Sequence, residues 1–209
     1  MPATDYLGFP TLTWRQDSRN SLSSGFIENR WVHREGFGIP RDHASMASVT
    51  GPTSIVWPSK FSPERSRVHV RNEIELWVRP DRAWTWLVRA KLWPTWYPNS
   101  SRVEIAGGVR DLYAGARFRW RTFGVNLSST VEEFVPPCRL AWAARGIGVD
   151  VYHAWLITPS EHGCHVLTEE SQYGLLARLD HALRPMRMSR GHQMWLEALR
   201  DRASVDPPP

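Results

Sequence analysis

Ala116-Arg117-Phe118-Arg119-Trp120-Arg121 is the stretch that decides the fold, because apolar residues alternate in it with arginines. Successive side chains of a β-strand point to opposite faces of a sheet. The alternation therefore predicts a half-buried strand whose rings face inward and whose guanidinium groups lie in water.

Further strand-like segments lie on both sides of this stretch, and turn signals separate them. The expected strands cover residues 68–78, 103–105, 126–135, 138–145, 149–158 and 164–173. The turn signals are Gly107-Gly108, Pro136-Pro137, Gly146-Ile147-Gly148 and a loop from Pro159 to Gly163. Connections this short predict an antiparallel meander of about six strands.

Helices are expected before and after the meander. One helix begins at Pro80, and a shorter helical piece ends at Pro98, because proline suits a first turn and stops a helix later on. After Gly174, apolar residues recur at helical spacing to about Ala203, with a kink or break at Pro185. This order predicts an α+β domain in which a curved antiparallel sheet wraps around a long C-terminal helix.

Residues 1–65 have a different composition from the rest of the chain. They are rich in Ser, Gly, Pro and Asn and show no sustained period, yet they contain Phe9, Trp14, Phe26, Trp31, Phe37, Trp57 and Phe61. A solvated linker would not carry so many rings. We expect an irregular arm that packs on the domain of residues 66–204, on a partner subunit or on a second copy. Residues 205–209 form an expected disordered tail.

Composition excludes several classes of protein. The 12 tryptophans exclude disorder along the whole length, and no apolar run approaches the roughly 18 residues of a membrane span. The formal net charge of +5 invites nucleic-acid binding, but the basic residues, all Arg except Lys60 and Lys91, are scattered among acids. We therefore expect no nucleic-acid partner. The N-terminus also lacks the layout of a signal peptide.

The two cysteines are expected to be free thiols. The predicted strands place Cys138 and Cys164 at the same end of two strands that a third separates, about 10 Å apart and beyond disulfide reach. Free thiols indicate a reducing compartment, so the expected location is cytoplasmic.

Four segments of the chain resemble the START-like (SRPBCC) superfamily, especially its polyketide cyclase/dehydrase branch. They are residues 84–98 with their tryptophan-rich helix pair, Gly115-Ala116-Arg117-Phe118, the strand–proline turn–strand of residues 131–142, and the last hairpin from Tyr152 to Gly174. The resemblance covers residues 67–203. It implies a helix-grip fold that binds a hydrophobic ligand; members include aromatase/cyclases, lipid carriers and hormone receptors.

The resemblance also implies particular residues. In the aromatase/cyclases, an arginine on a middle strand and a tyrosine near the second helix orient a polyketide. The comparable middle-strand stretch here is Glu132-Glu133-Phe134 and has no arginine, which departs from the cyclase pattern. Tyr97 stands where the tyrosine is expected.

Strand parity predicts the inner surface of the sheet. If Phe118 and Trp120 face inward, a tight turn at Ile147-Gly148 pairs Trp142 with His153 and Leu140 with Trp155. The predicted ligand-binding residues are Trp93, Trp96, Phe118, Trp120, Trp142, Trp155, Tyr173, Met188 and Trp195. A solid aromatic core without a cavity is the alternative.

The candidate catalytic residues are Tyr97, His153, Glu169 and His192. Neighbouring strand residues face opposite ways, so one of Glu132/Glu133 and one of Glu169/Glu170 should point inward unless a bulge intervenes. The register favours Glu169 as the inward member. A buried carboxyl or imidazole suits acid–base work, and structural ion pairs or hydrogen-bonded core histidines are the alternatives. The segment Glu161-His162-Gly163-Cys164-His165 is expected to be a turn rather than a metal site.

These observations favour binding of a hydrophobic, aromatic or polyketide-derived small molecule between the sheet and the C-terminal helix. The enzyme hypothesis is a cofactor-free and metal-free cyclase or dehydratase of secondary metabolism, in which aromatic walls hold a reactive chain in one folded shape. The alternatives are a carrier or sensor without chemistry and an interaction subunit that docks through its arm.

Overall fold

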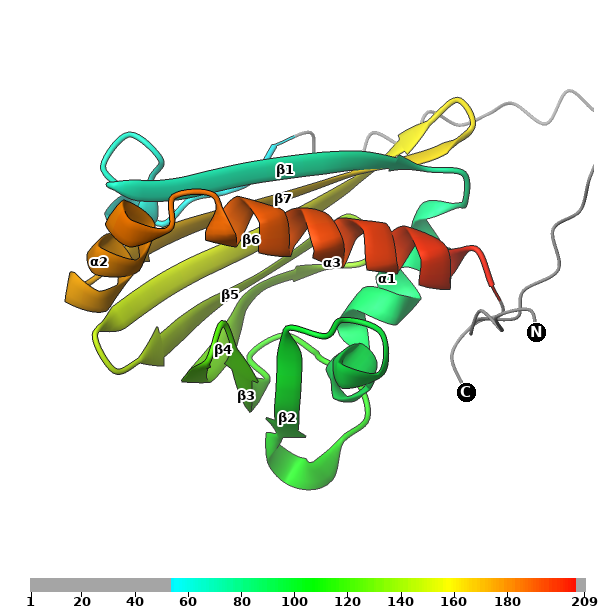
Figure 1. Ribbon diagram of the computed structural model, residues 1–209. Coiled ribbons are helices and arrows are strands. Elements are labelled where there is room, and N and C mark those ends of the chain that lie inside the picture. Colours follow the sequence, from blue (N-terminus) through cyan, green and yellow to red (C-terminus); the bar gives the residue numbers. More distant parts are fainter. Residues whose placement is uncertain (1–53, 206–209) are drawn as a thin grey trace, which may run out of the picture. The chain divides into compact units, whose positions relative to one another are not determined.

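The computed structural model describes residues 54–205, and Figure 1 shows the arrangement of their helices and strands. The predictions for residues 1–53 and for the tail 206–209 lie outside the described residues. Among the described residues, no helix has both the length and the apolar character to cross a membrane.

Seven antiparallel strands form one sheet in the order β1-β7-β6-β5-β4-β3-β2 (Figure 1). Their bounds are β1 Val68–Leu76, β2 Ser100–Ile105, β3 Arg117–Thr122, β4 Val125–Val135, β5 Arg139–Gly146, β6 Val149–Ser160 and β7 Gly163–Tyr173. β2 to β7 form the predicted meander. β1 joins its far edge by pairing with β7, which lies about 100 residues away in the sequence, so only tertiary structure brings these two strands together.

The helices cover one face of the sheet. α1 (Pro80–Val88) and the 3-10 helix η2 (Ala90–Thr95) precede the meander, and α2 (Leu175–Leu183) and α3 (Arg187–Ala203) follow it. Pro185 separates α2 from α3, as predicted. α3 runs along the inner face of the sheet beside β1 (Figure 1). These elements confirm the predicted α+β architecture, a seven-stranded antiparallel sheet packed against a long C-terminal helix.

The alternation in β3 has the expected consequence. Phe118 and Trp120 are buried, whereas Arg117, Arg119 and Arg121 are exposed on the outer face of the sheet. The expected pairing of β5 with β6 is also confirmed, because Trp142 lies opposite His153 and Leu140 opposite Trp155. Cys138 and Cys164 are free, as predicted, and both are buried.

The outer face of the sheet carries a second, smaller apolar cluster. Trp57 and Phe61 are the arm aromatics that lie within the described residues, and both pack on the ring of Tyr152, with centroid distances of 5.6 and 5.7 Å. The other arm aromatics lie outside the described residues.

A β-bulge decides the orientation of the first acidic pair. The register of β4 against β5 shifts between Val131 and Glu133. Beyond the bulge, Glu133 lies opposite Ala141 on the outer face and forms an ion pair with Arg139 at 2.7 Å. Glu132 is exposed on the same face. The bulge therefore keeps both carboxylates off the inner face, which is the exception that the parity argument allowed.

Candidate functional site

A cavity of about 320 Å³ lies between the inner face of the sheet, α2 and the start of α3. Its apolar lining includes Val68, Trp120, Phe123, Val125, Leu127, Trp142, Val149, Val151, Leu176, Ala177, Leu179, Leu183, Met188 and Trp195. The strands contribute one wall because every second side chain of β4, β5 and β6 points toward the helices. The volume is at the lower end of the range of small-molecule sites, about 300–1,000 Å³.

Arg187 connects the elements that cover this cavity. Its guanidinium donates hydrogen bonds to a carboxylate oxygen of Asp180 on α2, at 2.9 Å, and to the carbonyl oxygen of Phe123 at the β3–β4 turn, at 3.0 Å. The same guanidinium stacks over the Phe123 ring, 5.4 Å from its centroid. One side chain thus holds α2, α3 and the β3–β4 turn in one arrangement.

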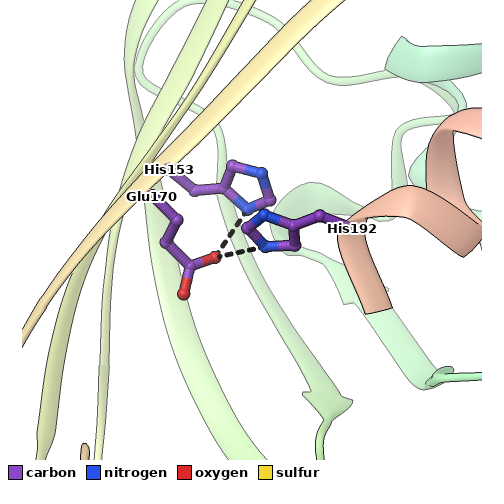
Figure 2. A group of neighbouring side chains, drawn as sticks. All are labelled: His153, Glu170 and His192. Atoms are coloured by element: carbon purple, nitrogen blue, oxygen red, sulfur yellow. Dashed lines mark hydrogen bonds and ion pairs between the residues drawn. The ribbon is translucent and has the colours of Figure 1, made fainter. Parts of the chain in front are cut away.

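Three buried polar side chains meet on the mostly apolar wall, and we call them the polar trio: His153 on β6, Glu170 on β7 and His192 on α3 (Figure 2). The other polar lining residues are Thr122, Gln172, Asp180, His181, Arg184 and Arg187. The Oε2 atom of Glu170 lies 3.0 Å from Nδ1 of His153 and 3.3 Å from Nε2 of His192. The two imidazole rings stack with their centroids 4.7 Å apart. All three side chains are buried.

The surroundings of the trio set its charge. Burial lowers the pKa of His153 to about 4, although the Glu170 carboxylate beside it acts in the opposite direction. Burial alone would raise the pKa of the Glu170 carboxyl, but the two imidazoles beside it outweigh burial and hold that pKa below its usual range. The trio is therefore a buried carboxylate facing two imidazole nitrogens.

Hydrogen bonds from neighbouring residues fix the orientation of the trio side chains. Nε2 of His153 lies 2.7 Å from the hydroxyl of Thr168, and the side-chain amide of Gln172 donates to Oε1 of Glu170. Nδ1 of His192 is buried without a hydrogen-bond partner among the described residues. One ligand atom from each member of the trio lies within 4.8 Å of the others, a spacing that could hold a metal ion.

The prediction that Glu169 is the inward member of its pair is wrong. Glu169 points to the outer face, where its carboxylate lies 3.2 Å from Nε2 of His69 and 3.4 Å from the Arg71 guanidinium. The loop expected over residues 159–163 is a two-residue turn that pairs Ser160 with Gly163. This register puts Glu170 opposite His153, one residue from the expected position, and a shift of one residue exchanges the two faces of a strand.

The same register corrects the prediction for Tyr173. Tyr173 belongs to the outer cluster, with its ring 5.7 Å from that of Phe61, and does not line the cavity. The inner neighbour at this end of β7 is Gln172, which does line the cavity.

The predicted aromatic wall divides into two parts. Trp120, Trp142, Met188 and Trp195 line the cavity as expected. By contrast, Trp93, Trp96, Phe118 and Trp155 lie in the packed core and outside the cavity lining, because their rings fill the space between the sheet, η2 and α3. The interior is therefore solidly packed at the end near η2, and it contains a cavity at the end under α2.

Tyr97 belongs to the packed end as well. Its ring stacks on Trp195 with a centroid distance of 4.4 Å, and its hydroxyl accepts a hydrogen bond from the Asn99 amide at 2.9 Å. Burial raises the pKa of this hydroxyl above its usual value. Tyr97 does not line the cavity, so its predicted catalytic role has no support from its position.

The segment from Glu161 to His165 covers the two-residue turn and the start of β7, and it spreads its side chains in different directions. The imidazole of His162 stacks on Trp77, whereas Cys164 is buried in the core and His165 lies near Glu73, at 3.6 Å. These side chains do not converge.

Sequence reasoning missed the contribution of α2. Leu176, Leu179 and Leu183 line the cavity while remaining partly exposed. Their helical spacing is visible in the sequence. That spacing does not distinguish exposed leucines at a cavity from buried leucines of the core.

Comparison with known proteins identifies the fold family. The family described as "Polyketide cyclase / dehydrase and lipid transport" matches residues 67–203, which confirms the resemblance found in the sequence. None of the curated proteins searched gives a significant match.

Solved structures show the same fold. A hypothetical protein from Helicobacter pylori is 30% identical with a TM-score of 0.66; the match covers 75% of this chain and 99% of that one. A di-domain ARO/CYC protein of the steffimycin biosynthetic pathway is 17% identical with a TM-score of 0.55, over 65% of this chain and 50% of that one. A Thermus thermophilus protein is also 17% identical, with a TM-score of 0.55, over 65% and 96%.

Proposed function

We propose that this chain, which belongs to the polyketide cyclase/dehydrase and lipid transport family, binds a flat, aromatic or polyketide-derived small molecule in the cavity under α2. Membership of this family implies that the ligand is hydrophobic. The observation that carries the proposal is a mostly apolar, tryptophan-rich cavity with the buried polar trio on its wall.

The lining suits a flat ligand better than a flexible acyl chain. Trp120, Trp142 and Trp195 offer ring faces and edges, and aromatic groups prefer to stack or meet edge to face. The volume of about 320 Å³ favours a compact polycyclic molecule over a long chain. The polar trio then receives an oxygen function of the ligand, since a buried polar group stabilises a ligand that pairs with it.

The catalytic form of this proposal is a cyclisation or dehydration of the bound ligand in secondary metabolism. Aromatic walls would hold the reactive chain in one folded shape, so that proximity lowers the barrier, and the trio would act on the oxygen function. Once a substrate is known, Glu170→Gln should lower turnover by about a hundredfold and change ligand affinity less than about threefold. Unchanged turnover in that variant would remove the trio from the chemistry.

Carriage without chemistry is the second candidate function. It is favoured by the exposed apolar side chains of α2, in particular Leu176 and Leu183, which line the cavity. A carrier should return its ligand chemically unchanged.

Ligand binding can be tested with a cavity-filling variant. Native mass spectrometry of the purified full chain should detect a co-purified small molecule, and 1,8-dihydroxyanthraquinone should quench the tryptophan fluorescence on titration. Ala177→Trp, at a buried lining residue, should weaken this binding at least about tenfold, because an indole there occupies the cavity.

Ala182→Trp provides the matched control, since Ala182 lies on the same helix but is exposed. It should bind the probe as the unmodified chain does. Equal binding by both variants would show that the cavity is not the site.

A further inference from the structure

The three members of the polar trio come from separate elements and converge on one point (Figure 2). β6 supplies His153, β7 supplies Glu170 and α3 supplies His192. Their ligand atoms lie within 4.8 Å of one another, and all three side chains are buried. Such a convergence of two imidazoles and one carboxylate is the donor set of many transition-metal sites.

The separations between the donor atoms fit a shared cation. A zinc-like ion binds imidazole nitrogen and carboxylate oxygen at about 2.0–2.2 Å, which places neighbouring ligand atoms of a tetrahedron about 3.3 Å apart. In the trio, Oε2 of Glu170 lies 3.0 Å from one imidazole nitrogen and 3.3 Å from the other. The two imidazole nitrogens lie within 4.8 Å of each other. They have to approach to about 3.3 Å for an ion to bind all three atoms at these bond lengths.

The outer hydrogen bonds also suit a metal site. Metal-ligating histidines usually bond through their second nitrogen to a neighbouring group, which fixes the ring orientation. The hydroxyl of Thr168 lies 2.7 Å from Nε2 of His153, which leaves Nδ1 directed at the carboxylate. Gln172 holds the other oxygen of Glu170 and leaves Oε2 for the centre of the trio.

We infer that His153 (through Nδ1), Glu170 (through Oε2) and His192 (through Nε2) bind one divalent first-row transition-metal ion at the wall of the cavity. Two nitrogen donors disfavour Mg²⁺ and Ca²⁺, which prefer all-oxygen sites. Three protein ligands leave coordination positions open for water or for an oxygen atom of a molecule in the cavity. The inference deepens the proposed function, because it identifies what the trio would present to the ligand.

A metal-free arrangement is the competing description. In it, both imidazoles donate N–H groups to Glu170 and no cation enters. The two descriptions differ in a measurable property, the affinity of the full chain for a cation such as Co²⁺ or Zn²⁺.

The test uses the full chain without a histidine tag, stripped with a chelator and then titrated with Co²⁺ under anaerobic conditions. We expect one ion per chain, visible-region absorption typical of nitrogen and oxygen ligands, and displacement by Zn²⁺. Paramagnetic shifts or broadening of NMR signals should be strongest for His153 and His192. Absence of stoichiometric binding would overturn the inference.

Variants locate the ion. Glu170→Gln and His192→Gln should each weaken Co²⁺ binding at least about a hundredfold, because even an outer-shell change commonly costs about 10–100-fold. Thr168→Val, which removes the outer hydrogen bond, should weaken it about tenfold. His165→Gln is the matched control, since this partly exposed imidazole beside Glu73 lies outside the trio, and it should bind Co²⁺ as the unmodified chain does.

Two further measurements make every outcome decisive. If the trio variants do not fold, as judged by near-ultraviolet circular dichroism, the NMR mapping on the unmodified chain still locates the ion, and signals centred on other histidines would refute the site. Ala177→Trp should lose the anthraquinone probe but keep Co²⁺. If the unmodified chain binds Co²⁺ but does not bind the anthraquinone probe, the proposed ligand function is rejected while the metal site is retained.

Discussion

At the scale of single residues, Trp195 joins the packed core to the cavity. Its ring stacks on Tyr97 and meets Trp93 and Trp155 edge to face at centroid distances of 5.1 and 5.0 Å. It also lines the cavity beside His192, which precedes it by one turn of α3. A large ring in this place stabilises the fold through burial and contributes part of the wall available to a ligand.

Trp195→Ala should therefore lower the free energy of unfolding by about 3–5 kcal/mol, because the variant loses buried area and leaves a cavity. Trp77→Ala is the control: Trp77 is 77% exposed, and its replacement should change stability by no more than about 0.5 kcal/mol. Urea unfolding measures both. Similar losses in the two variants would contradict the role given to Trp195.

At the scale of elements, the position of α2 depends on a close approach of the chain to the β5–β6 turn. Gly174, which precedes α2, has φ of 113°, and a Cβ there would lie 2.3 Å from the carbonyl oxygen of Gly148. The amide of Leu176 donates to the same oxygen at 3.1 Å. A residue without a side chain thus lets α2 begin directly above the turn and cover the cavity.

Gly174→Ala should lower stability by about 2–3 kcal/mol or displace α2, since both the positive φ and the steric contact oppose a side chain. Amide hydrogen exchange should become faster in α2 while β5 and β6 keep their protection. In the control Gly115→Ala, φ is +79° but no atom lies within 4 Å of the new Cβ, so only about 1 kcal/mol should be lost. Unchanged exchange in α2 would refute this account of how the helix is placed.

At the scale of the whole described unit, the two faces of the sheet are covered by different parts of the chain. The helices cover the inner face, whereas Trp57 and Phe61 cover part of the outer face over Tyr152. Phe61 is buried there against Tyr152 and Tyr173. A sheet with apolar residues on both faces needs cover on both, which gives the end of the arm a packing role.

Phe61→Ala should accordingly lower the free energy of unfolding by about 3 kcal/mol, through loss of burial on the outer face. Val56→Ala, at an exposed residue of the same segment, should have an effect of about 0.5 kcal/mol or less. Thermal or urea unfolding of the two full-length variants gives the comparison. A stability loss no larger than that of Val56→Ala would show that the outer cluster contributes little.

The fold was largely predictable from the sequence, and the candidate site was predictable only in part. Alternation identified β3 and its two faces, and the short turn at residues 147–148 set the pairing of Trp142 with His153. The partner carboxylate was missed by one residue, because a two-residue turn at 161–162 replaced the expected longer loop. A strand's own sequence does not specify the length of its turn to that accuracy, and one residue exchanges its faces.

The sequence by itself determined which segments are strands and helices, where Pro185 separates the last two helices, and which side chains of β3 are buried. These properties depend on residues a few positions apart, whose periodicity is visible along the chain. Only the tertiary structure decided that β1 pairs with β7, that the tryptophans fill one end of the interior and leave a cavity at the other, and that His192 meets His153 and Glu170. The physical reason is that packing and convergence depend on contacts between residues far apart in sequence, whose distances no local pattern contains.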